Sequence, residues 1–569
     1  MSKYKDLTKE KLLEIVEQQD KELQDPKKYG LFWDKEKVVE KVVADCENNL
    51  PVMKRIGSKE IKTDDSEDNI LIEGDNYHAL NVLNYTHRNK IDVIYIDPPY
   101  NTGNKDFIYN DKFIDRENGY RHSMWINFME KRLGVAKKLL KEDGIIFISI
   151  DDNEQAQLKM LCDKILGENN FVSNITIQGT ANESNEGVMF QSVTEYLLCY
   201  AKDKSIAKIN KIDAVSQNWR SLNDAPSGLS SRRQMGYTIY YNPDTQDVIP
   251  EIDYDTSGDF SDMENIYVDD KELLGKRYIP IRPKARNGTA WRWRWGMETL
   301  IERKNELRFR QNRNGDWVVE FGQSGFNAPR DYQEFGTGTT GLKKIFGGKE
   351  VFTRPKSTEF IKWVLEVGAN KSATVLDFMA GSGTTGHAVL DLNKEDGGNR
   401  KFILCTNNEN KICEEVTYPR ISKVINGYKN LKKETVKGLG GNLKYFKTDF
   451  VKNTNNRDQL KINLTKKCTE ILCVKENIFN LKKDQENYKI FTSNDGTRHL
   501  CIYYNFIDKD FDNFVKDISK LNGTKAVYIF ALNNKIDKKE FKSIKNVSFE
   551  AIPYKILEVY EQLVKISKK

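Results

Sequence analysis

Asp97, Pro98, Pro99 and Tyr100 form the stretch whose residue types point most directly to chemistry. They follow an apolar run, residues 91–96, that is typical of a buried strand, and two consecutive prolines cannot continue a strand ladder. The strand must therefore end there, which leaves a carboxylate, a backbone carbonyl and an aromatic ring at its carboxyl edge. In open α/β sheets, ligands bind at this edge. Such a group of atoms suits the capture of a flat ring that carries an amine.

A second stretch, residues 375–385, predicts a strand, a Gly-X-Gly turn and a helix that begins at Thr384. In such a turn, Gly381 and Gly383 let the backbone approach a ligand closely, and the helix start offers free N–H groups to a carboxylate or phosphate. The stretch does not continue as a phosphate loop, because Gly386, the next glycine, is followed by His387 and Ala388 where Lys and Ser or Thr are needed. A near copy, residues 336–341, does not follow an apolar strand, and we predict that it is a flexible loop.

The elements that must position these two stretches alternate between strand and helix. We predict strands at 70–72, 91–96, 144–150, 171–177, 193–200, 374–378, 401–405 and 526–530. We predict helices at 6–24, 35–48, 77–83, 123–141, 154–166, 360–367, 384–392 and 556–563. This alternation, which is lost between residues 203 and 348, favours a mostly parallel, doubly wound α/β sheet with a long insert.

Composition excludes several classes of protein. The chain has 90 Lys and Arg against 84 Asp and Glu, a net charge of +6, so a surface that binds anions requires a local excess. Its eight cysteines include no CxxC pair and its five histidines lie far from metal-ligand spacing, which argues against a zinc site and a disulfide scaffold. No apolar run approaches the roughly 18 residues of a membrane span, and no signal-peptide pattern is present. We therefore expect a cytoplasmic protein without membrane contact.

A local excess of positive charge lies in residues 280–315, which hold ten Lys and Arg against three Glu. Within it, Trp291-Arg-Trp-Arg-Trp295 interleaves cations with aromatic rings, a pattern suited to phosphate contact and groove insertion. An amphipathic strand with Trp inward and Arg in solvent would give the same pattern, and both can hold at once. The predicted DNA-binding residues are Arg282, Lys284, Arg286, Trp291, Arg292, Arg294, Arg303, Arg308 and Arg310.

The pairing of the Asp97–Tyr100 stretch with the later glycine turn resembles the amino-methyltransferases that use S-adenosylmethionine. Their circularly permuted members place the catalytic motif ahead of the cofactor motif, as this chain does. The fuller match, residues 71–76 ahead of residues 97–106, is similar to the modification (Mod) subunits of type III restriction–modification systems. Residues 29–33, 195–202 and 556–560 also look like that family.

The resemblance implies a Rossmann-like methyltransferase sheet in permuted motif order. It divides the chain into a helical arm at 1–58, a first methyltransferase segment with the catalytic motif at 59–202, a target-recognition domain at 203–348, a second methyltransferase segment with the cofactor motif at 349–435, and an α/β domain for assembly or partner contact at 436–569.

The implied activity is methyl transfer from S-adenosylmethionine to the N6 amine of an adenine that is flipped from the duplex, without a metal. Hydrogen bonds from that amine to the Asp97 carboxylate and the Pro98 carbonyl would favour a more nucleophilic nitrogen and aim it at the methyl group. Asp97 is also the candidate proton acceptor. Pro99 stiffens the turn, and Tyr100 offers a stacking face to the base. Alternatively, Tyr100 packs the turn only.

For the cofactor, the family motif implies contacts from both stretches. Asp75 matches an acidic position near the adenosine, although a simple helix-capping role is the alternative. The acidic residue expected for the ribose is offset here, which leaves Asn407 and Glu409 as candidates, and Pro355-Lys356 resembles a motif along the methionine end. The predicted cofactor-binding residues are Asp75, Asp97, Phe378, Ala380, Gly381, Gly383, Thr384, Asn407 and Glu409.

The resemblance also implies partners. Double-stranded DNA is the implied substrate, a homodimer the implied assembly, and a separate helicase–nuclease restriction (Res) subunit the implied partner, since this chain shows no helicase or nuclease motif. Methylation of cytosine N4 or of RNA is an alternative activity, although Ser in place of Asp97 is the commoner N4 pattern. A catalytically idle DNA-recognition subunit is an alternative from a different class.

Overall fold

The computed structural model describes residues 40–567, Val16 and Trp33, with gaps at 105, 111, 180–191, 212–218, 259, 261–265, 287, 313, 323–327, 455, 506–509, 532–535 and 537–538. The predicted helix at 6–24 thus falls outside the described residues, apart from Val16. The chain divides into two compact units. The main unit comprises Met1–Asn210 and Arg330–Lys569, and the inserted unit comprises Lys211–Pro329.

A ten-stranded sheet forms the centre of the main unit, in the order β1-β20-β2-β17-β16-β3-β6-β8-β7-β15. The neighbours from β20 to β6 are all parallel, as are β7 and β15, whereas β1 and β8 run antiparallel to their neighbours. The strands are β1 (Asn49–Arg55), β20 (Asn442–Lys452), β2 (Asp68–Glu73), β17 (Lys401–Thr406), β16 (Thr374–Asp377), β3 (Ile91–Ile96), β6 (Leu140–Ile150), β8 (Thr194–Ala201), β7 (Phe171–Gln178) and β15 (Tyr332–Glu334). The predicted, mostly parallel doubly wound sheet is confirmed.

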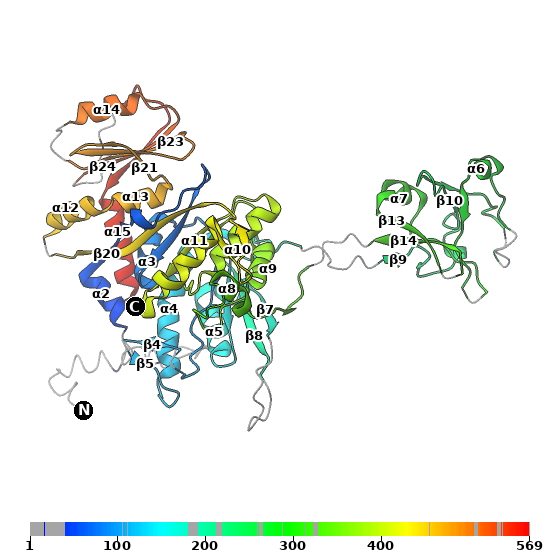
Figure 1. The fold of residues 1–569 in the computed structure, drawn as a ribbon, viewed down its shortest axis with the longest axis horizontal. Coiled ribbons are helices and arrows are strands. Elements are labelled where there is room, and N and C mark those ends of the chain that lie inside the picture. The colour runs from blue at the N-terminus through cyan, green and yellow to red at the C-terminus, as the bar shows by residue number, and fades with distance from the viewer. Residues whose placement is uncertain are drawn as a thin grey trace. The chain divides into compact units, whose positions relative to one another are not determined.

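Helices cover both faces of this sheet, which explains why its central strands are apolar along their whole length. Strands β3, β16 and β17 are almost entirely buried. One group of helices packs together as α3 (Asn76–Thr86), α4 (Arg121–Leu139) and α5 (Gln155–Cys162). A second group packs together as α9 (Thr358–Gly368), α10 (Thr384–Asp396) and α11 (Tyr418–Asn426) (Figure 1).

The main sheet extends past two of the predicted segment boundaries. After α2 (Lys41–Asn48), the arm predicted to be helical ends in the edge strand β1, which pairs with β20. Strand β20, predicted to belong to the C-terminal domain, lies between β1 and β2 instead. The predicted flexible loop at 336–341 is also wrong in part, because Gly338–Ile345 forms helix α8. A Cβ atom at Gly338 would lie 2.3 Å from the Lys356 carbonyl oxygen, so glycine permits a close approach of two backbones there.

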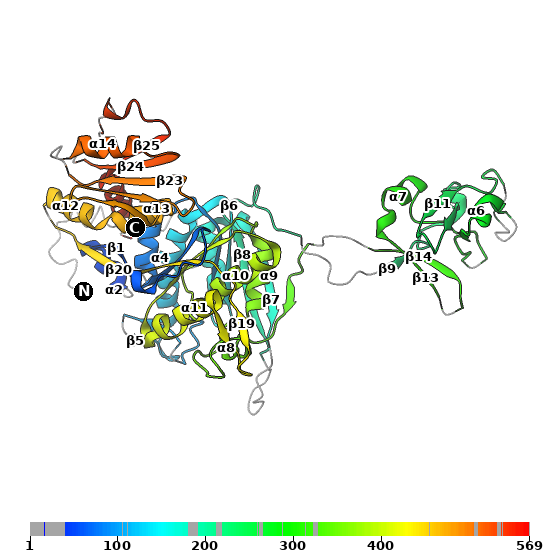
Figure 2. The same ribbon diagram turned by 45° about the horizontal axis from the view of Figure 1, so that its top comes forward.

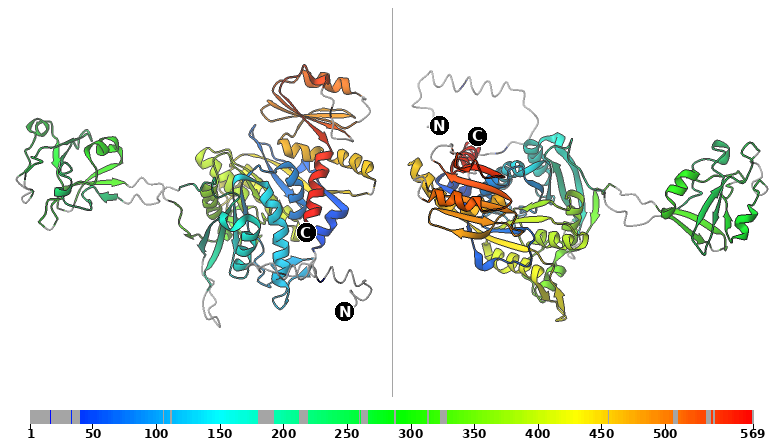
Figure 3. Two further views of the ribbon diagram at one scale, coloured as in Figure 1. Left: turned by 180° about the vertical axis from the view of Figure 1, so that it is seen from behind. Right: turned by 90° about the horizontal axis from the view of Figure 1, so that it is seen from above.

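The C-terminal part of the main unit contains a second, five-stranded sheet in the order β21-β22-β23-β24-β25 (Figure 2). Residues along β23 and β24 alternate between two cores: Leu500, Ile502 and Tyr528 join the core of the main sheet, whereas Cys501 and Val527 pack with α14. The elements here are α12 (Arg457–Lys467), α13 (Thr469–Glu476), β21 (Asn480–Asp484), β22 (Tyr488–Thr492), β23 (Arg498–Tyr503), α14 (Phe511–Ser519), β24 (Thr524–Phe530), β25 (Val547–Ile552) and α15 (Tyr554–Ser567). Helix α15 returns to pack on α2 and α3 (Figure 3).

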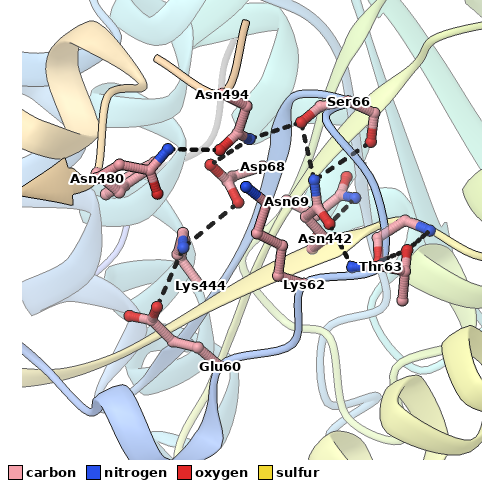
Figure 4. A network of polar contacts seen from close by, with 12 residues as sticks. Glu60, Lys62, Thr63, Ser66, Asp68, Asn69, Asn442, Lys444, Asn480 and Asn494 are labelled. Atoms are coloured by element: carbon pink, nitrogen blue, oxygen red, sulfur yellow. Dashed lines mark hydrogen bonds and ion pairs between the residues drawn. The ribbon is translucent and has the colours of Figure 1, made fainter. Parts of the chain in front are cut away.

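A polar network joins the second sheet to the main sheet (Figure 4). The side chain of Asn494 donates to the Ser66 carbonyl at 2.7 Å and to the Asp68 carboxylate at 3.2 Å. The buried Lys444 ammonium lies 3.6 Å from Asp68 and 3.0 Å from Glu60. These contacts satisfy charged groups that the junction would otherwise bury without partners.

The inserted unit contains two three-stranded sheets, β11-β10-β12 and β13-β14-β9. Trp293 and Trp295 point into its core, and the Trp293 indole donates to the Tyr237 carbonyl at 2.7 Å. The elements are β9 (Trp219–Ser221), β10 (Thr238–Tyr241), β11 (Val248–Glu251), α6 (Lys271–Gly275), β12 (Ile279–Ile281), α7 (Met297–Glu302), β13 (Leu307–Gln311) and β14 (Trp317–Gly322).

All eight cysteines are buried and unpaired. Within the described part of the chain, every helix is too short or too polar to cross a membrane.

Candidate active site

The two stretches singled out in the sequence meet where the order of the sheet reverses. Strand β3 leads through α4 to β6 on one side, and β16 leads through α10 to β17 on the other, while β3 and β16 pair directly. Their carboxyl ends therefore lie side by side at the switch point of the sheet, the usual position of a ligand crevice. A cavity of about 560 Å³ opens there.

Most of the predicted site residues line this cavity. From the catalytic stretch these are Asp97, Pro98 and Pro99, and from the predicted cofactor set they are Asp75, Asp97, Phe378, Gly381, Asn407 and Glu409. Tyr100, Ala380, Gly383 and Thr384 are not on the wall.

The Asp97 turn (residues 97–101) is fixed by bonds from two helices. The indole of Trp125, on α4, donates to the Pro99 carbonyl at 2.7 Å. Asn101 has a left-handed backbone with φ +57°, and its side-chain amide donates to the Glu154 carboxyl at 2.5 Å. Glu154 is completely buried, which raises its pKa to about 8, so it is largely protonated at neutral pH.

A second set of contacts surrounds the Asp97 side chain. The Lys356 ammonium lies 3.5 Å from Asp97 Oδ1, forms an ion pair with Glu195 and donates to the Tyr100 hydroxyl at 2.5 Å. The Tyr100 hydroxyl in turn donates to Glu195 Oε2 at 3.0 Å. Burial raises the pKa of Asp97 even though the Lys356 charge acts to lower it. The turn thus combines a partly desolvated carboxylate with a fixed counter-ion.

The glycine turn has the backbone that its sequence requires. Gly381 has φ +46° and Gly383 has φ +78°, where Gly383 caps the start of α10 in the left-handed conformation. Beneath the turn, Asp377 accepts from the Thr385 hydroxyl at 2.5 Å and from the Met379 amide at 3.0 Å. Burial raises the pKa of Asp377 to about 7. The conformation of the turn is therefore stabilised by a buried carboxylate at the end of β16.

A buried arginine lies under the same turn. Arg420, from α11, donates to the hydroxyls of Thr384 at 2.7 Å and Ser382 at 3.0 Å, and is only 1% exposed. None of the ion pairs among the described residues includes Arg420, and burial lowers its pKa to about 9. A guanidinium with hydroxyl partners makes the start of α10 more electropositive.

At the opposite wall, Asp75 caps a helix and also lies where the predicted cofactor contact would require it. Its carboxylate accepts from the Tyr77 amide at 2.7 Å as the cap of α3, and it also lines the cavity. Arg132 holds this wall through Glu40, with bonds of 2.7 and 2.9 Å, and lies 3.7 Å from Asp75. Asn407 and Glu409 lie on the wall beyond β17, with a side-chain contact of 3.4 Å between them.

Lys356, Glu195, Glu154 and Arg132 were absent from the residues proposed from the sequence. Lys356 belongs to the Pro355-Lys356 motif named above. Its contacts form only because the Asp97 turn, strand β8 and the segment before α9 come together in the fold. Glu195 is the second residue of β8 and opens the 195–202 stretch that resembles the Mod family, but nothing in that stretch indicates a contact with the Asp97 turn. Glu154 and Arg132 have no signal in the sequence, because their partners lie more than thirty residues away.

All nine predicted DNA-binding residues lie in the inserted unit, but most of their charges are compensated there. Arg308 and Arg310 both bind Glu320. Arg282 pairs with two aspartates, Lys284 with Asp316 and Arg303 with Glu306. Residues 211–329 contain 17 Lys and Arg against 18 Asp and Glu. The excess found in residues 280–315 is therefore a property of that stretch and not of the unit.

Two positions in the Trp-Arg repeat differ sharply. Arg292 is 5% exposed and bonds to Ser227 and to the Trp293 carbonyl, so its guanidinium serves the core of the unit. Arg294 is exposed and donates to the Asp224 carbonyl at 2.9 Å. Near it, Arg220 bonds to the Asp224 carboxylate at 2.7 Å and Arg286 lies 3.9 Å from it. Arg220, Arg286 and Arg294 form the arginine cluster, in which two cations share the Asp224 carboxylate and the third binds the Asp224 carbonyl.

Comparison with known proteins agrees with this geometry. A protein-family model described as DNA methylase matches residues 91–418, more than half of the chain. The type III restriction–modification enzyme EcoPI Mod subunit of Escherichia phage P1 is 32% identical over 448 residues, 70% of this chain and 66% of that subunit. The type II methyltransferase M.KpnI of Klebsiella pneumoniae is 37% identical over 370 residues, 60% of this chain and 82% of that protein.

Among solved structures, the crystal structure of M1.HpyAVI aligns with 62% of this chain and 96% of its own, at 15% identity and a TM-score of 0.28. The chain matches about two thirds of the length of the EcoPI Mod subunit.

Proposed function

Because the chain belongs to the DNA methylase family, we propose that it transfers a methyl group from S-adenosylmethionine to the N6 amine of an adenine flipped out of double-stranded DNA. We further propose that it is the modification subunit of a type III restriction–modification system, as the name of its EcoPI relative states for that protein. One observation carries the proposal. Asp97 and Gly381, far apart in the sequence, line a single cavity at the switch point of the sheet.

The cavity fits the proposed cofactor. Its volume of about 560 Å³ lies within the range of cofactor sites, and its wall combines apolar Phe378 with acidic Asp75 and Glu409. Carboxylates suit the hydroxyl and amine donors of an adenosine, while the α10 start above Arg420 suits a carboxylate. When bound, S-adenosylmethionine supplies an electrophilic methyl group on a sulfonium. The residues of this chain bind it and orient the acceptor.

Asp97 is the residue that we propose contacts the acceptor amine. An exocyclic amine of adenine is a weak nucleophile, because its lone pair is conjugated into the ring. A hydrogen bond to the Asp97 carboxylate, aided by the Pro98 carbonyl, directs the nitrogen toward the cavity and favours a pyramidal geometry. Because burial raises the pKa of Asp97, this carboxylate is also suited to accept the proton that the amine loses.

Tyr100 is the proposed stacking surface for the flipped base. Its hydroxyl is held by Glu195 and Lys356, so its ring has a fixed orientation beside the Asp97 turn. Stacking of a base on an aromatic ring typically contributes about 1–3 kcal/mol. A fixed ring contributes more of that free energy, since less rotational freedom is lost on binding.

For contact with the DNA backbone, we propose the arginine cluster of the inserted unit, with Trp291 beside it. Arg286 lies 5.2 Å from the centre of the Trp291 ring, which presents cation and ring together. The paired residues Arg282, Lys284, Arg303, Arg308 and Arg310 each have a carboxylate within 3.0 Å that they would have to give up to bind phosphate. By contrast, Arg286 lies 3.9 Å from its carboxylate, and Arg294 contacts a carbonyl. Exchange of one ion pair for another yields little free energy.

A tritium-transfer assay tests the proposed activity. The full chain is incubated with labelled S-adenosylmethionine and unmethylated genomic DNA, and the labelled nucleoside is identified after digestion. We expect N6-methyladenine. Labelled N4-methylcytosine, or label in an RNA control but not in DNA, would replace the adenine assignment, and no label in any arm would overturn the enzyme assignment.

The proposed assembly needs its own measurement. We expect the full chain to be a homodimer in light scattering and to co-purify with a Res subunit encoded beside it. A monomer that methylates DNA without any such partner would indicate a solitary methyltransferase instead.

A further inference from the structure

Lys356 reaches the Asp97 carboxylate from the side that faces away from solvent. Asp97 Oδ1 is buried and makes no hydrogen bond among the described residues, and the Lys356 Nζ atom lies 3.5 Å from it. The Asp97 side chain as a whole is 31% exposed, so the exposed part of the carboxylate is the Oδ2 side. Lys356 therefore contacts one oxygen and leaves the other open to the cavity that Asp97 lines.

The position of Lys356 is fixed along both its backbone and its side chain. Its carbonyl packs against Gly338 of α8 and accepts from the Thr384 hydroxyl at 3.3 Å, and the following residue, Ser357, caps α9. At the other end, the ammonium is bound by Glu195 and by the Tyr100 hydroxyl. A lysine side chain held at both ends behaves as a fixed charge rather than as a mobile surface cation.

Several charged or titratable groups act on Asp97, and they oppose one another. Lys356 favours the ionised carboxylate, whereas burial and the negative charge of Glu195 favour the protonated form. Tyr100, beside Asp97 in the turn, remains neutral because burial raises its pKa well above its usual range, and the same holds for Tyr95 on β3. Asp377, at the end of β16, is the other nearby acid, and burial raises its pKa to about 7. Lys356 is the only cation among these groups.

We propose that Lys356 is a positioning residue that keeps the Asp97 carboxylate ionised and turns its open oxygen toward the acceptor amine, and that Glu195 limits this effect by sharing the lysine. This inference rests on the proposed methyl transfer. It assigns opposite effects to two neighbouring side chains. Without Lys356, Asp97 binds a proton more readily and loses the ability to accept a hydrogen bond from the amine. Without the Glu195 charge, Lys356 acts on Asp97 alone.

The test is the pH dependence of single-turnover methyl transfer, measured between pH 5.5 and 9 with the full chain, labelled S-adenosylmethionine and unmethylated genomic DNA. For Lys356→Met, we expect the acid limb to move up by about half a pH unit or more, which lowers the rate about threefold at pH values below the limb. For Glu195→Gln, which retains an acceptor for Lys356 and Tyr100, we expect the limb to move down. Lys356→Arg keeps the charge and should leave the limb in place.

Binding measurements separate this effect from damage to the site. Affinity for S-adenosylmethionine, measured by calorimetry, should remain within about threefold of wild type in all three variants. Acid limbs that coincide with wild type, or that move in the same direction for Lys356→Met and Glu195→Gln, would overturn the inference. If wild type transfers no label, the proposed function itself has failed, which is a distinguishable result. Should Lys356→Met not fold, the downward shift of Glu195→Gln still decides the question.

Discussion

The Asp97 turn and the inserted unit both concentrate charged side chains, but they hold them in different ways. In the Asp97 turn, Asp97 Oδ1 is buried without a hydrogen bond among the described residues, and so is Oε2 of Glu154, which binds the turn through Asn101. In the inserted unit, most of the cations bind a carboxylate close by, as Arg308 and Arg310 bind Glu320. The first arrangement costs folding free energy and keeps groups reactive, whereas the second is nearly neutral. A local excess of charge in the sequence thus says little about which cations remain unpaired in the fold, whereas the interrupted strand correctly placed Asp97 at the cavity.

The largest expected effect in the inserted unit is the loss of stability on replacing Arg292, whose charge is buried and, among the described residues, not paired with a carboxylate. Arg292→Ala removes a buried side chain and its bonds to Ser227 and the Trp293 carbonyl, so we expect the free energy of unfolding to fall by about 2–3 kcal/mol. Arg294→Ala is the matched control, because Arg294 is two residues away and exposed. Thermal or denaturant unfolding of the full chain measures both variants. Equal stability of the two would show that Arg292 is not part of the core.

Replacing Gly381 tests whether the cavity beside the Asp97 turn binds the cofactor. Gly381→Val places a branched side chain at φ +46°, with its Cβ atom 3.3 Å from the Phe352 ring and at the cavity wall, and left-handed backbone alone costs about 1–2 kcal/mol. We expect affinity for S-adenosylmethionine to fall at least about tenfold. Gly397→Val is the control, since Gly397 has φ +67° but no atom within 4 Å of an added Cβ. If calorimetry gives both variants the same loss, backbone strain alone is responsible and the cavity assignment is wrong.

The smallest expected effect is on DNA binding, where two pairs of arginines in the inserted unit should differ in the salt dependence of affinity. Changing Arg286 and Arg294 together to Ala should weaken DNA binding and reduce the slope of log affinity against log salt by about 2, because each proposed phosphate contact is lost. Changing Arg308 and Arg310 together should leave the slope unchanged and lower stability instead, since Glu320 then lacks its partners. Fluorescence anisotropy at several salt concentrations measures the slope. A reduced slope for the second pair alone would move the DNA contact to the β13–β14 hairpin.

Much of the main sheet could be predicted because its strands are buried on both faces. The apolar runs that became β3, β6, β16 and β17 have no other stable position, and the prolines after Ile96 mark where a strand must end. Strands β1 and β20 were missed because both combine apolar and charged residues, as edge or near-edge strands do. Helix α8 was missed because a glycine-rich sequence usually indicates a loop, and here one glycine serves close packing instead.

The site was predictable only where one local motif carried it. Asp97 and Gly381 could be found because each follows a strand end, and their meeting follows from the order of the sheet. Lys356 and Glu195 could not be assigned, since the role that we propose for them depends on contacts between the turn, β8 and the segment before α9. Arg292 was assigned to DNA from its composition, but alternation in the sequence does not reveal which arginine the fold buries.

The most direct test of the proposed methyl-transfer site compares Asp97→Ala with Asp143→Ala. Asp143 is an exposed acid near the start of strand β6, whereas the cavity lies at the carboxyl ends of the parallel strands. For each full-length variant, S-adenosylmethionine binding and single-turnover tritium transfer to unmethylated genomic DNA are measured on the same preparation. We predict that Asp97→Ala loses at most about tenfold in cofactor affinity, since Asp97 is one of several predicted cofactor contacts, while transfer falls by about a thousandfold or more, and that Asp143→Ala retains both. Transfer by Asp97→Ala at a rate close to that of Asp143→Ala would contradict the assignment of the site.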